Sequence, residues 1–244
     1  MKAYGNNILI SADFSGDYRP GFGLENLITP NLFPPYRSET DTTIMVIDLG
    51  VATKFDYFAI GAHNFTSGVD ITLEYNSINA WVTPAGSMTI DYAAGNIVKE
   101  FTELNYRYLR LVIDDTGNPD TYIQMGKLSA GSAYAMPDVE PGFDLPIAGR
   151  STVATSPTGQ VYGTTGVSLI GFNVNIITAS KATVDTFNTF YELNQNVIPF
   201  FIAIYPESLD KYPLLHCRIV SNVIQWRHEQ DGNYSTVINM EEVR

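Results

Sequence analysis

The sequence predicts a mainly β protein of two domains, with one helix in the second domain. The chain holds 15 Tyr, 13 Phe and 2 Trp in 244 residues, and aromatic side chains suit the pleated surface of a sheet. Several stretches alternate apolar and polar residues, as half-buried strands do, most clearly residues 69–75. Only residues 178–193 carry apolar side chains at the three-to-four spacing of a helix.

Residues 1–42 are predicted to form an extended arm that packs on the first domain. Gly and Pro recur too often between Gly16 and Pro35 for a regular element. Leu24, Leu27 and Phe33 nevertheless make the segment too apolar for a free tail. Residues 11–37 and the linker described below are the two segments expected to bridge neighbouring subunits.

Residues 43–131 are predicted to be a β-sandwich. Thr43 to Phe65 reads as two strands joined by a tight connection at Asp48-Leu49-Gly50. Residues 106–114 and 122–128 supply further strands, and the residues between 114 and 120 form a loop by their Asp, Gly, Asn and Pro content.

Residues 132–165 are rich in Gly, Pro, Ser and Thr and are predicted to be a linker between two domains. Residues 166–244 form the second domain, with a strand at 167–177, the helix at about 178–193 capped by Thr178 or Ser180, and a buried strand at 198–205. Strands are also expected at 214–220, 223–226 and 234–240, with a hairpin turn at Asp231-Gly232-Asn233.

Composition excludes several classes of function. The formal net charge is −12, so nucleic acid is not an expected partner, because a phosphate backbone needs clustered Lys and Arg. Cys217 is the single cysteine, which excludes an internal disulfide and predicts a buried small apolar side chain. The N-terminus lacks the pattern of a signal peptide, and no apolar run reaches the length of a membrane-spanning helix. No membrane insertion is therefore expected.

Two polar clusters are candidates for chemistry. His63-Asn64 at a strand end could act as a base and an orienting amide, but no nucleophile motif lies nearby, which favours a local structural role. A loop carries oxygen ligands that calcium favours but lacks the spacing of an EF-hand; the calcium candidates are Asp114, Asp115, Asn118 and Asp120. The alternative is a solvated turn. The sequence predicts no cofactor.

A second set of candidates concerns sugars. Paired carboxylates for glycoside hydrolysis would have to come from Asp48, Asp56 and Asp70, which the sequence cannot place across a cleft. His216 and His228 have no metal-binding spacing. Aromatic side chains could form a sugar-stacking platform, with Trp81 and Tyr92 as the main candidates and Tyr36 and Tyr122 beside them. Core or interface packing is the alternative for each.

Two groups of motifs together resemble a discoidin-like (galactose-binding-like) jelly-roll β-sandwich. The first is Ile47-Asp48-Leu49-Gly50 with residues 55–60 and His63-Asn64, and the second is residues 106–111 with an Asn-Pro turn and residues 122–128. This combination, with the strand, helix and Ile198-Pro199-Phe200-Phe201 of the second half, is similar to tail-tip and baseplate (distal tail-type) proteins of tailed bacteriophages.

The resemblance implies a structural virion protein that is not an enzyme. It would be assembled in the host cytoplasm, become part of the tail, and act through contacts with copies of itself and with other tail proteins. The alternative is a carbohydrate-binding module that recognises a host-surface glycan. Saturable sugar binding that is lost in Trp81→Ala would favour this alternative.

Overall fold

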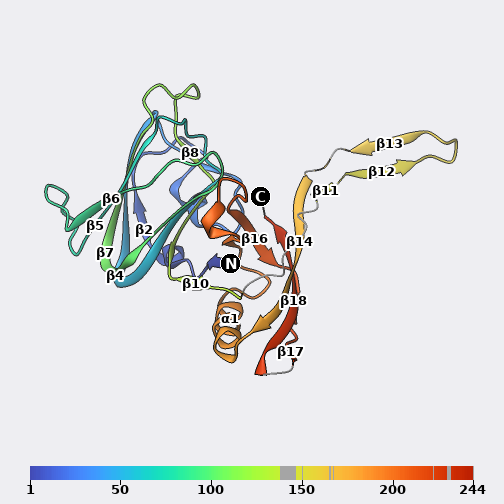
Figure 1. The fold of residues 1–244 in the computed structure, drawn as a ribbon. Coiled ribbons are helices and arrows are strands. Elements are labelled where there is room, and N and C mark those ends of the chain that lie inside the picture. Colours follow the sequence, from blue (N-terminus) through green and yellow to red (C-terminus); the bar gives the residue numbers. More distant parts are fainter. Residues whose placement is uncertain are drawn as a thin grey trace.

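The structure is a computed structural model that describes residues 1–137, 147–149, 151–164, 166, 168–221, 223–229 and 232–243. It is mainly β, with a sandwich in the N-terminal half and a second sheet with one α-helix in the C-terminal half (Figure 1). Every strand pair among the described residues is antiparallel. The predicted fold class is confirmed.

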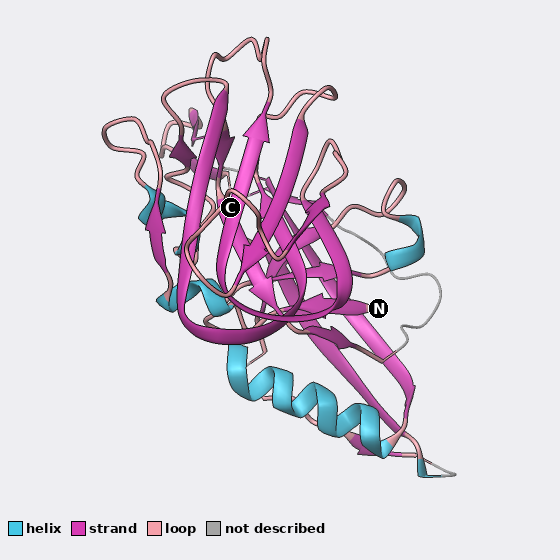
Figure 2. Ribbon diagram, turned by 90° about the vertical axis from the view of Figure 1, so that its left-hand side faces the viewer, coloured by secondary structure: helices cyan, strands magenta, loops and turns pink. Residues whose placement is uncertain are grey.

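The sandwich is built on a six-stranded sheet in which β2, β4, β7, β5 and β6 lie in that order and β9 pairs with β4. Its strands are β2 (Asp13–Ser15), β4 (Thr42–Gly61), β5 (Asp70–Asn76), β6 (Gly86–Thr89), β7 (Ile97–Asp114) and β9 (Lys127–Gly131). A two-stranded sheet of β3 (Tyr36–Arg37) and β8 (Gln124–Met125) lies beside it. Figure 2 shows the long strands curving along the body of the sandwich.

The two longest strands, β4 and β7, bend where their register shifts, between Asp48 and Thr53 and again between Phe55 and Tyr57. Gly50 adopts a φ of 78° at the first shift, a conformation that glycine tolerates best, and its N–H donates to Asp48 Oδ1 at 2.8 Å. The predicted break at Asp48-Leu49-Gly50 is therefore a bulge within one continuous strand. Such bulges let a strand bend and its sheet curl around a core.

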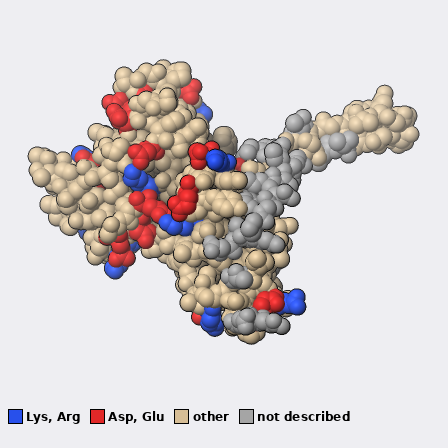
Figure 3. All heavy atoms as spheres, viewed as in Figure 1, with Lys and Arg blue, Asp and Glu red and all other residues tan. Residues whose placement is uncertain are grey.

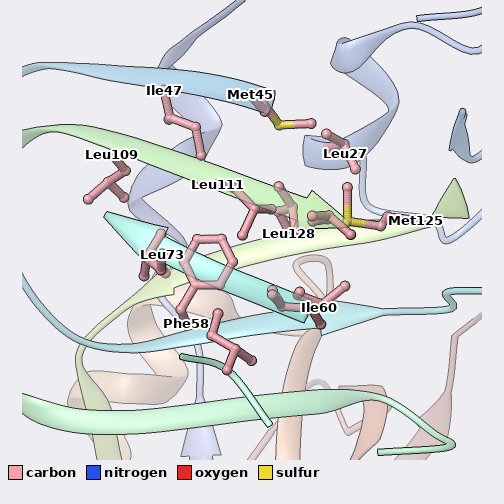
Figure 4. Packing of buried hydrophobic residues seen from close by; sticks show 14 of the residues in the cluster. Leu27, Met45, Ile47, Phe58, Ile60, Leu73, Leu109, Leu111, Met125 and Leu128 are labelled. Carbon is pink, nitrogen blue, oxygen red and sulfur yellow. The ribbon is translucent and has the colours of Figure 1, made fainter. Parts of the chain in front are cut away.

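The core of the sandwich is closed by side chains from both long strands and from the shorter segments that pack against them. Figure 4 shows them pointing toward one another. Those that are fully buried in this cluster include Leu27, Met45, Ile47, Phe58, Ile60, Leu73, Leu109, Leu111, Met125 and Leu128. The predicted alternation of residues 69–75 is confirmed on β5, where Ile71 and Leu73 face inward.

Residues 8–37 form part of the sandwich. The segment contains the short 3-10 helices η1 (Ile8–Ser11) and η2 (Leu24–Ile28), and β2 pairs with β4. Leu9 and Leu27 are fully buried and Leu24 is almost so. The segment therefore packs within its own chain, and its apolar residues explain why a Gly- and Pro-rich stretch is ordered here.

The C-terminal half is an eight-stranded sheet in the order β10, β1, β15, β16, β18, β14 and β11, with β17 also on β18. Its elements are β1 (Lys2–Tyr4), β10 (Ala133–Ala135), β11 (Ile147–Gly149), β14 (Ser168–Ala179), α1 (Lys181–Asn194), β15 (Phe200–Ala203), η3 (Pro206–Ser208), β16 (Leu215–Ile219), β17 (Arg227–His228) and β18 (Tyr234–Glu242). A separate hairpin joins β12 (Thr152–Thr155) to β13 (Val161–Thr164).

Helix α1 begins and packs as its sequence predicts. Ser180 is the N-cap, and its side chain accepts from Thr183 N at 3.2 Å. Val184, Phe187 and Phe190 are buried against the sheet, while Tyr191 is half-buried. Cys217 is fully buried in the same core, as expected for a small apolar side chain.

One strand prediction in this half differs from the structure. Residues 223–226 form no strand, because Trp226 and Ile224 instead pack at the edge of the core from an irregular segment. The hairpin turn predicted at Asp231-Gly232-Asn233 falls in sequence between the paired strands β17 and β18, and its first residue, Asp231, lies outside the described residues.

The two halves are joined by the first strand of the chain. β1 lies between β10 and β15 in the C-terminal sheet, whereas the sequence predicts that residues 1–42 all pack on the first domain. A three-residue strand has no periodicity that could reveal its partner. The predicted boundary at residues 132–165 stays a prediction, but β10 within it also pairs with β1.

A third apolar cluster forms the seam between the halves. Tyr4 of β1 and Tyr57 of β4 meet with ring centroids 5.2 Å apart, and Phe201 of β15 packs beside them. The buried Tyr57 hydroxyl donates to Gly5 O at 3.0 Å and lies 2.8 Å from Ser129 Oγ. One phenol therefore links the N-terminal segment to two strands of the sandwich.

We expect Tyr57→Phe to destabilise the protein by about 1–3 kcal/mol, because it leaves the buried Gly5 carbonyl and Ser129 hydroxyl without this partner. The measurement is urea unfolding, in which the midpoint should fall while the slope stays unchanged. Tyr18→Phe is the control, since Tyr18 is 49% exposed. Equal midpoints for the two variants would contradict the role of the Tyr57 hydroxyl.

Candidate functional sites

His63 and Asn64 form a structural corner at the end of β4. His63 Nδ1 accepts from Phe65 N at 3.1 Å, so Nε2 carries the proton and donates to Gly95 O at 2.7 Å. Burial lowers the pKa of His63. Because both ring nitrogens are engaged, the ring is not placed to act as a base.

Asn64 holds the loop that contains the predicted calcium ligands. Its side-chain amide donates to Asp120 Oδ2 at 3.0 Å and to Tyr122 O at 2.9 Å, and its Oδ1 accepts from Gln124 N at 2.7 Å. The predicted local role of the His63-Asn64 pair matches these contacts.

The loop carboxylates are engaged in hydrogen bonds. Asp115 is 2% exposed and accepts from Thr66 N at 2.9 Å, from the Thr66 hydroxyl and from Asn118 Nδ2 at 2.7 Å. Asp114 caps the next turn by accepting from Thr116 N and its hydroxyl, which lowers the pKa of Asp114. These contacts use both oxygens of Asp115 and one oxygen each of Asp114 and Asp120, and the calcium site stays a prediction.

The described ranges contain no group of three or more His, Cys, Asp or Glu side chains that could hold a metal ion. Over the same residues, no helix combines the length and the apolar character that crossing a bilayer requires.

Trp81 lies in the connection between β5 and β6, where it anchors the turn. Its Nε1 donates to Asn79 Oδ1 at 2.7 Å, and the Arg110 guanidinium carbon lies 4.9 Å from the ring centroid. Arg110 in turn forms an ion pair with Glu74. One face of the indole is therefore occupied by a cation from the same chain.

Tyr92 lies at the other end of this hairpin. Tyr75 pairs with Gly86 near Trp81, and Thr72 pairs with Thr89 near Tyr92, so the length of β6 separates the two aromatic residues. They do not form one platform.

Tyr92 borders a cleft of about 650 Å³ between the two halves of the protein, here called the Tyr92 cleft, which is lined by residues 91–98 and by Leu209, Asp210, Pro213 and Leu214. The Tyr92 ring is 36% exposed and meets His63 edge-on at 6.1 Å. Asp91 forms an ion pair with Lys99 at 2.7 Å. The cleft thus combines an aromatic face, apolar wall residues and carboxylates.

The other two predicted platform aromatics are not exposed rings. Tyr36 is fully buried, and its hydroxyl lies 2.9 Å from Thr43 Oγ1; burial raises its pKa. Tyr122 is half-buried, with the guanidinium carbons of Arg19 and Arg37 at 4.5 and 4.9 Å from its centroid. Both residues fix the loops that close one end of the sandwich.

The carboxylates considered for hydrolysis serve separate contacts. Arg107 holds Asp48 through two bonds of 2.7 and 2.8 Å, and this pairing lowers the pKa of Asp48 to about 2. Asp56 accepts from Ala133 N at 2.7 Å. Asp70 begins β5 at an exposed position. These contacts do not assemble a facing pair of carboxylates.

The feature that the sequence did not predict is the β12–β13 hairpin, which lies within the expected linker. It projects away from the body of the protein (Figure 1). Its turn is well defined: Ser156 N donates to Gln160 O at 2.8 Å, and Gly159 adopts a φ of 83°. Val153 and Val161 lie in a stretch rich in Ser, Thr and Gly and are a weak signal for strands. The sequence therefore does not predict the hairpin.

The hairpin has no core beneath it. From residue 154 to residue 164 every side chain is exposed except Ser156, which is half-buried. Val161 is 67% exposed and Tyr162 is 59% exposed. In Figure 3 its described atoms carry no charge, whereas acidic and basic side chains gather over the sandwich half. An isolated two-stranded hairpin is at best marginally stable in water.

Comparison with known proteins gives likenesses in structure alone. No protein-family model matches the sequence, and no curated protein matches it either. The lectin domain of lectinolysin, solved with Lewis B antigen, is 13% identical with a TM-score of 0.43, over 53% of this chain and 98% of that one.

Two further solved structures are similar over the same share of the chain. A chitosan-binding module of a Paenibacillus chitosanase/glucanase is 15% identical with a TM-score of 0.42, over 51% of this chain and 96% of that one. A GH29 fucosidase of Ruminococcus gnavus in complex with fucose is 15% identical with a TM-score of 0.43, over 52% of this chain and only 26% of that one. Likenesses of this extent assign no ligand to the chain.

His216 is a buried titratable group at the seam. It lies on β16 with its ring 4.9 Å from that of Phe201, and its Nδ1 donates to Val243 O at 3.1 Å. It is 1% exposed, and its Nε2 has no hydrogen-bond partner among the described residues. Burial lowers the pKa of His216 to about 4, and nearby Lys127 adds to the shift.

This pKa predicts a loss of stability in acid. An unfolded histidine titrates near pH 6.5, so between about pH 6.5 and pH 4 the unfolded chain takes up a proton that the folded chain does not. The free energy of unfolding should fall across this window by up to about 3 kcal/mol because of His216. Urea unfolding of His216→Leu should show a shallower pH dependence than the unmodified protein.

The control is His228→Leu, because His228 lies on the exposed strand β17. Its pH dependence should match that of the unmodified protein. If His216→Leu also leaves the pH dependence unchanged, the ring is not held neutral in the folded state.

Proposed function

We propose that this chain is a structural subunit that acts by associating with copies of itself, as a phage tail-tip or baseplate protein would. The single observation that carries the proposal is the projecting β12–β13 hairpin. This hairpin packs on no core of its own chain, and an isolated two-stranded hairpin is at best marginally stable in water. Contact with another surface would stabilise it.

The composition of the hairpin supports a protein partner. Its exposed residues include Val161 and Tyr162, and aromatic side chains such as that of Tyr162 are enriched at the core of protein interfaces. The sequence contains no charged residue from 151 to 180, although the whole chain carries a net charge of −12. A copy of the same chain meets the least repulsion where both surfaces lack charge.

Symmetry supports copies of the chain as the partner. A projecting element that docks elsewhere on an identical subunit makes a heterologous contact, and such contacts generate rings when the rotation closes. The motifs that resemble distal tail-type proteins are consistent with this mode of action. In this proposal the protein works through surfaces, and the sandwich loops stay available to other partners.

We expect the protein to form oligomers that are lost when residues 152–164 are replaced by a short Gly-Ser linker. The measurement is size-exclusion chromatography with light scattering at several concentrations. Val161→Glu should weaken association as well, because it places a carboxylate in an apolar contact.

The matched control is Val51→Glu, because Val51 is 68% exposed and Val161 is 67% exposed. It should leave the oligomer intact. An oligomer that survives replacement of the hairpin would overturn the role given to this element.

A second function is favoured by the Tyr92 cleft: recognition of a glycan. A half-exposed aromatic ring beside carboxylates in a cleft of this size is the kind of site that stacks on a sugar ring and accepts bonds from its hydroxyls. It involves Tyr92, Asp91 and Asp210. Trp81 is not part of it, since its connection lies at the other end of the β5–β6 hairpin.

If the cleft binds a glycan, a glycan array should give saturable binding that Tyr92→Ala abolishes. Trp81→Ala should leave that binding intact, which distinguishes the cleft from the turn that Trp81 anchors. Tyr18→Ala is the matched control, because Tyr18 is 49% exposed and lies outside the cleft. Binding that survives Tyr92→Ala would exclude this site.

A further inference from the structure

We propose that a pocket between the two halves of the protein, here called the seam pocket, binds a small uncharged ring compound that carries a hydroxyl group. The pocket has a volume of about 320 Å³. Its lining includes Leu32, Phe33, Pro35 and Ala62 from the N-terminal half and His216 and Glu242 from the C-terminal half. Ligand sites lie preferentially where two packed units meet. The seam pocket is separate from the hairpin that carries the proposed self-association.

His216 gives this pocket a hydrogen-bond acceptor without a donor. Its Nδ1–H donates to Val243 O at 3.1 Å, so the lone pair of the neutral ring lies on Nε2. The residue is 1% exposed, and Nε2 has no hydrogen-bond partner among the described residues. Buried polar groups in native proteins are nearly always paired, because an unpaired one costs free energy. A ligand that donates a hydrogen bond to Nε2 removes that cost.

The rest of the lining suits an apolar ring. Leu32, Pro35 and Ala62 offer apolar contact, and Phe33 is 72% exposed although it is a large aromatic residue. A ring at the mouth of a pocket can pack against the ring of a ligand. Small-molecule pockets start at about 300 Å³ and are mostly apolar with a few placed polar groups. The seam pocket has the size and the composition for one small ring.

Asn96 fixes the wall between the halves and leaves His216 as the group that needs a donor. Asn96 Oδ1 accepts from Ala62 N at 3.1 Å, and its Nδ2 donates to Leu214 O at 2.8 Å. The amide is therefore engaged at both ends by the protein. Asn96 lines the Tyr92 cleft as well, so the two hollows are neighbours and the test must tell them apart.

The charges around the pocket favour an uncharged ligand. The carboxylate of Glu242 lines the pocket, and its Oε2 accepts from Ile170 N at 3.0 Å. An anionic ligand would meet this carboxylate. A cation next to His216 is disfavoured by Lys127, which is 4% exposed and helps to lower the pKa of His216 to about 4. A neutral hydroxyl donor meets neither penalty.

Phenol and anisole are the probes, because they share a ring and differ in that only phenol has a hydroxyl donor. Isothermal titration of the unmodified protein at pH 7 should give saturable phenol binding that is about tenfold tighter than anisole binding. Nuclear magnetic resonance of the histidine ring nitrogens locates the ligand. Phenol should shift the Nε2 signal of His216 and leave that of His228, on the exposed strand β17, unchanged.

Two variants test the two parts of the site. His216→Leu should abolish the preference for phenol over anisole, because it removes the acceptor. Phe33→Ala should weaken phenol binding roughly fivefold, because it removes the aromatic contact. The matched control is Val51→Ala, since Val51 is 68% exposed and lies outside the pocket. It should bind phenol as the unmodified protein does.

Melting temperatures show whether each variant is folded. His216 is buried, so the resonance experiment and Phe33→Ala keep the proposal testable if His216→Leu does not fold. Equal affinities for phenol and anisole, or no saturable binding at millimolar concentration, would overturn the proposal. Phenol binding that leaves the Nε2 signal of His216 unmoved would overturn it too, because the phenol then lies in the Tyr92 cleft or elsewhere.

Discussion

The rest of the structure depends on the insertion of β1, the first strand, into the C-terminal sheet. β1 pairs with β10 on one side and β15 on the other, and Tyr57 of the sandwich reaches back to Gly5 next to it. The apolar seam of Tyr4, Tyr57 and Phe201 then packs the halves together. Because of this seam, the cleft at Tyr92 has walls from both halves, and His216 is buried beside Phe201.

The sequence predicts the parts of the fold that local periodicity records. Ile71 and Leu73 alternate into the core, Ser180 caps the helix, and Asp48-Leu49-Gly50 breaks the register of β4. It does not predict pairings that depend on distant residues. Lys2–Tyr4 is too short to show a period, and its neighbours, β10 and β15, lie more than a hundred residues away.

The candidate sites, too, can be predicted where neighbouring residues in the sequence determine them, and not where distant residues do. The local role of His63 and Asn64 could be inferred from a strand end followed by turn residues, and the hydrogen bonds agree with it. Trp81 and Tyr92 could be proposed for one sugar platform because the sequence does not show that β6 places them at opposite ends of a hairpin. The hairpin at 152–164 resembled a linker because Ser, Thr and Gly suit both a linker and an exposed strand pair, and only its backbone pairing distinguishes them.

Charge and exposure together indicate which part of the molecule makes contacts between copies. The sandwich carries most of the charged side chains visible in Figure 3, while residues 151–180 carry none. In our proposal the uncharged part makes the contacts between copies, and the sandwich is displayed by the assembly. The most direct test is sedimentation equilibrium of the unmodified protein over a wide range of concentrations. The account predicts a discrete multiple of the 27.0 kDa chain mass, and a mass of 27.0 kDa at every concentration would contradict it.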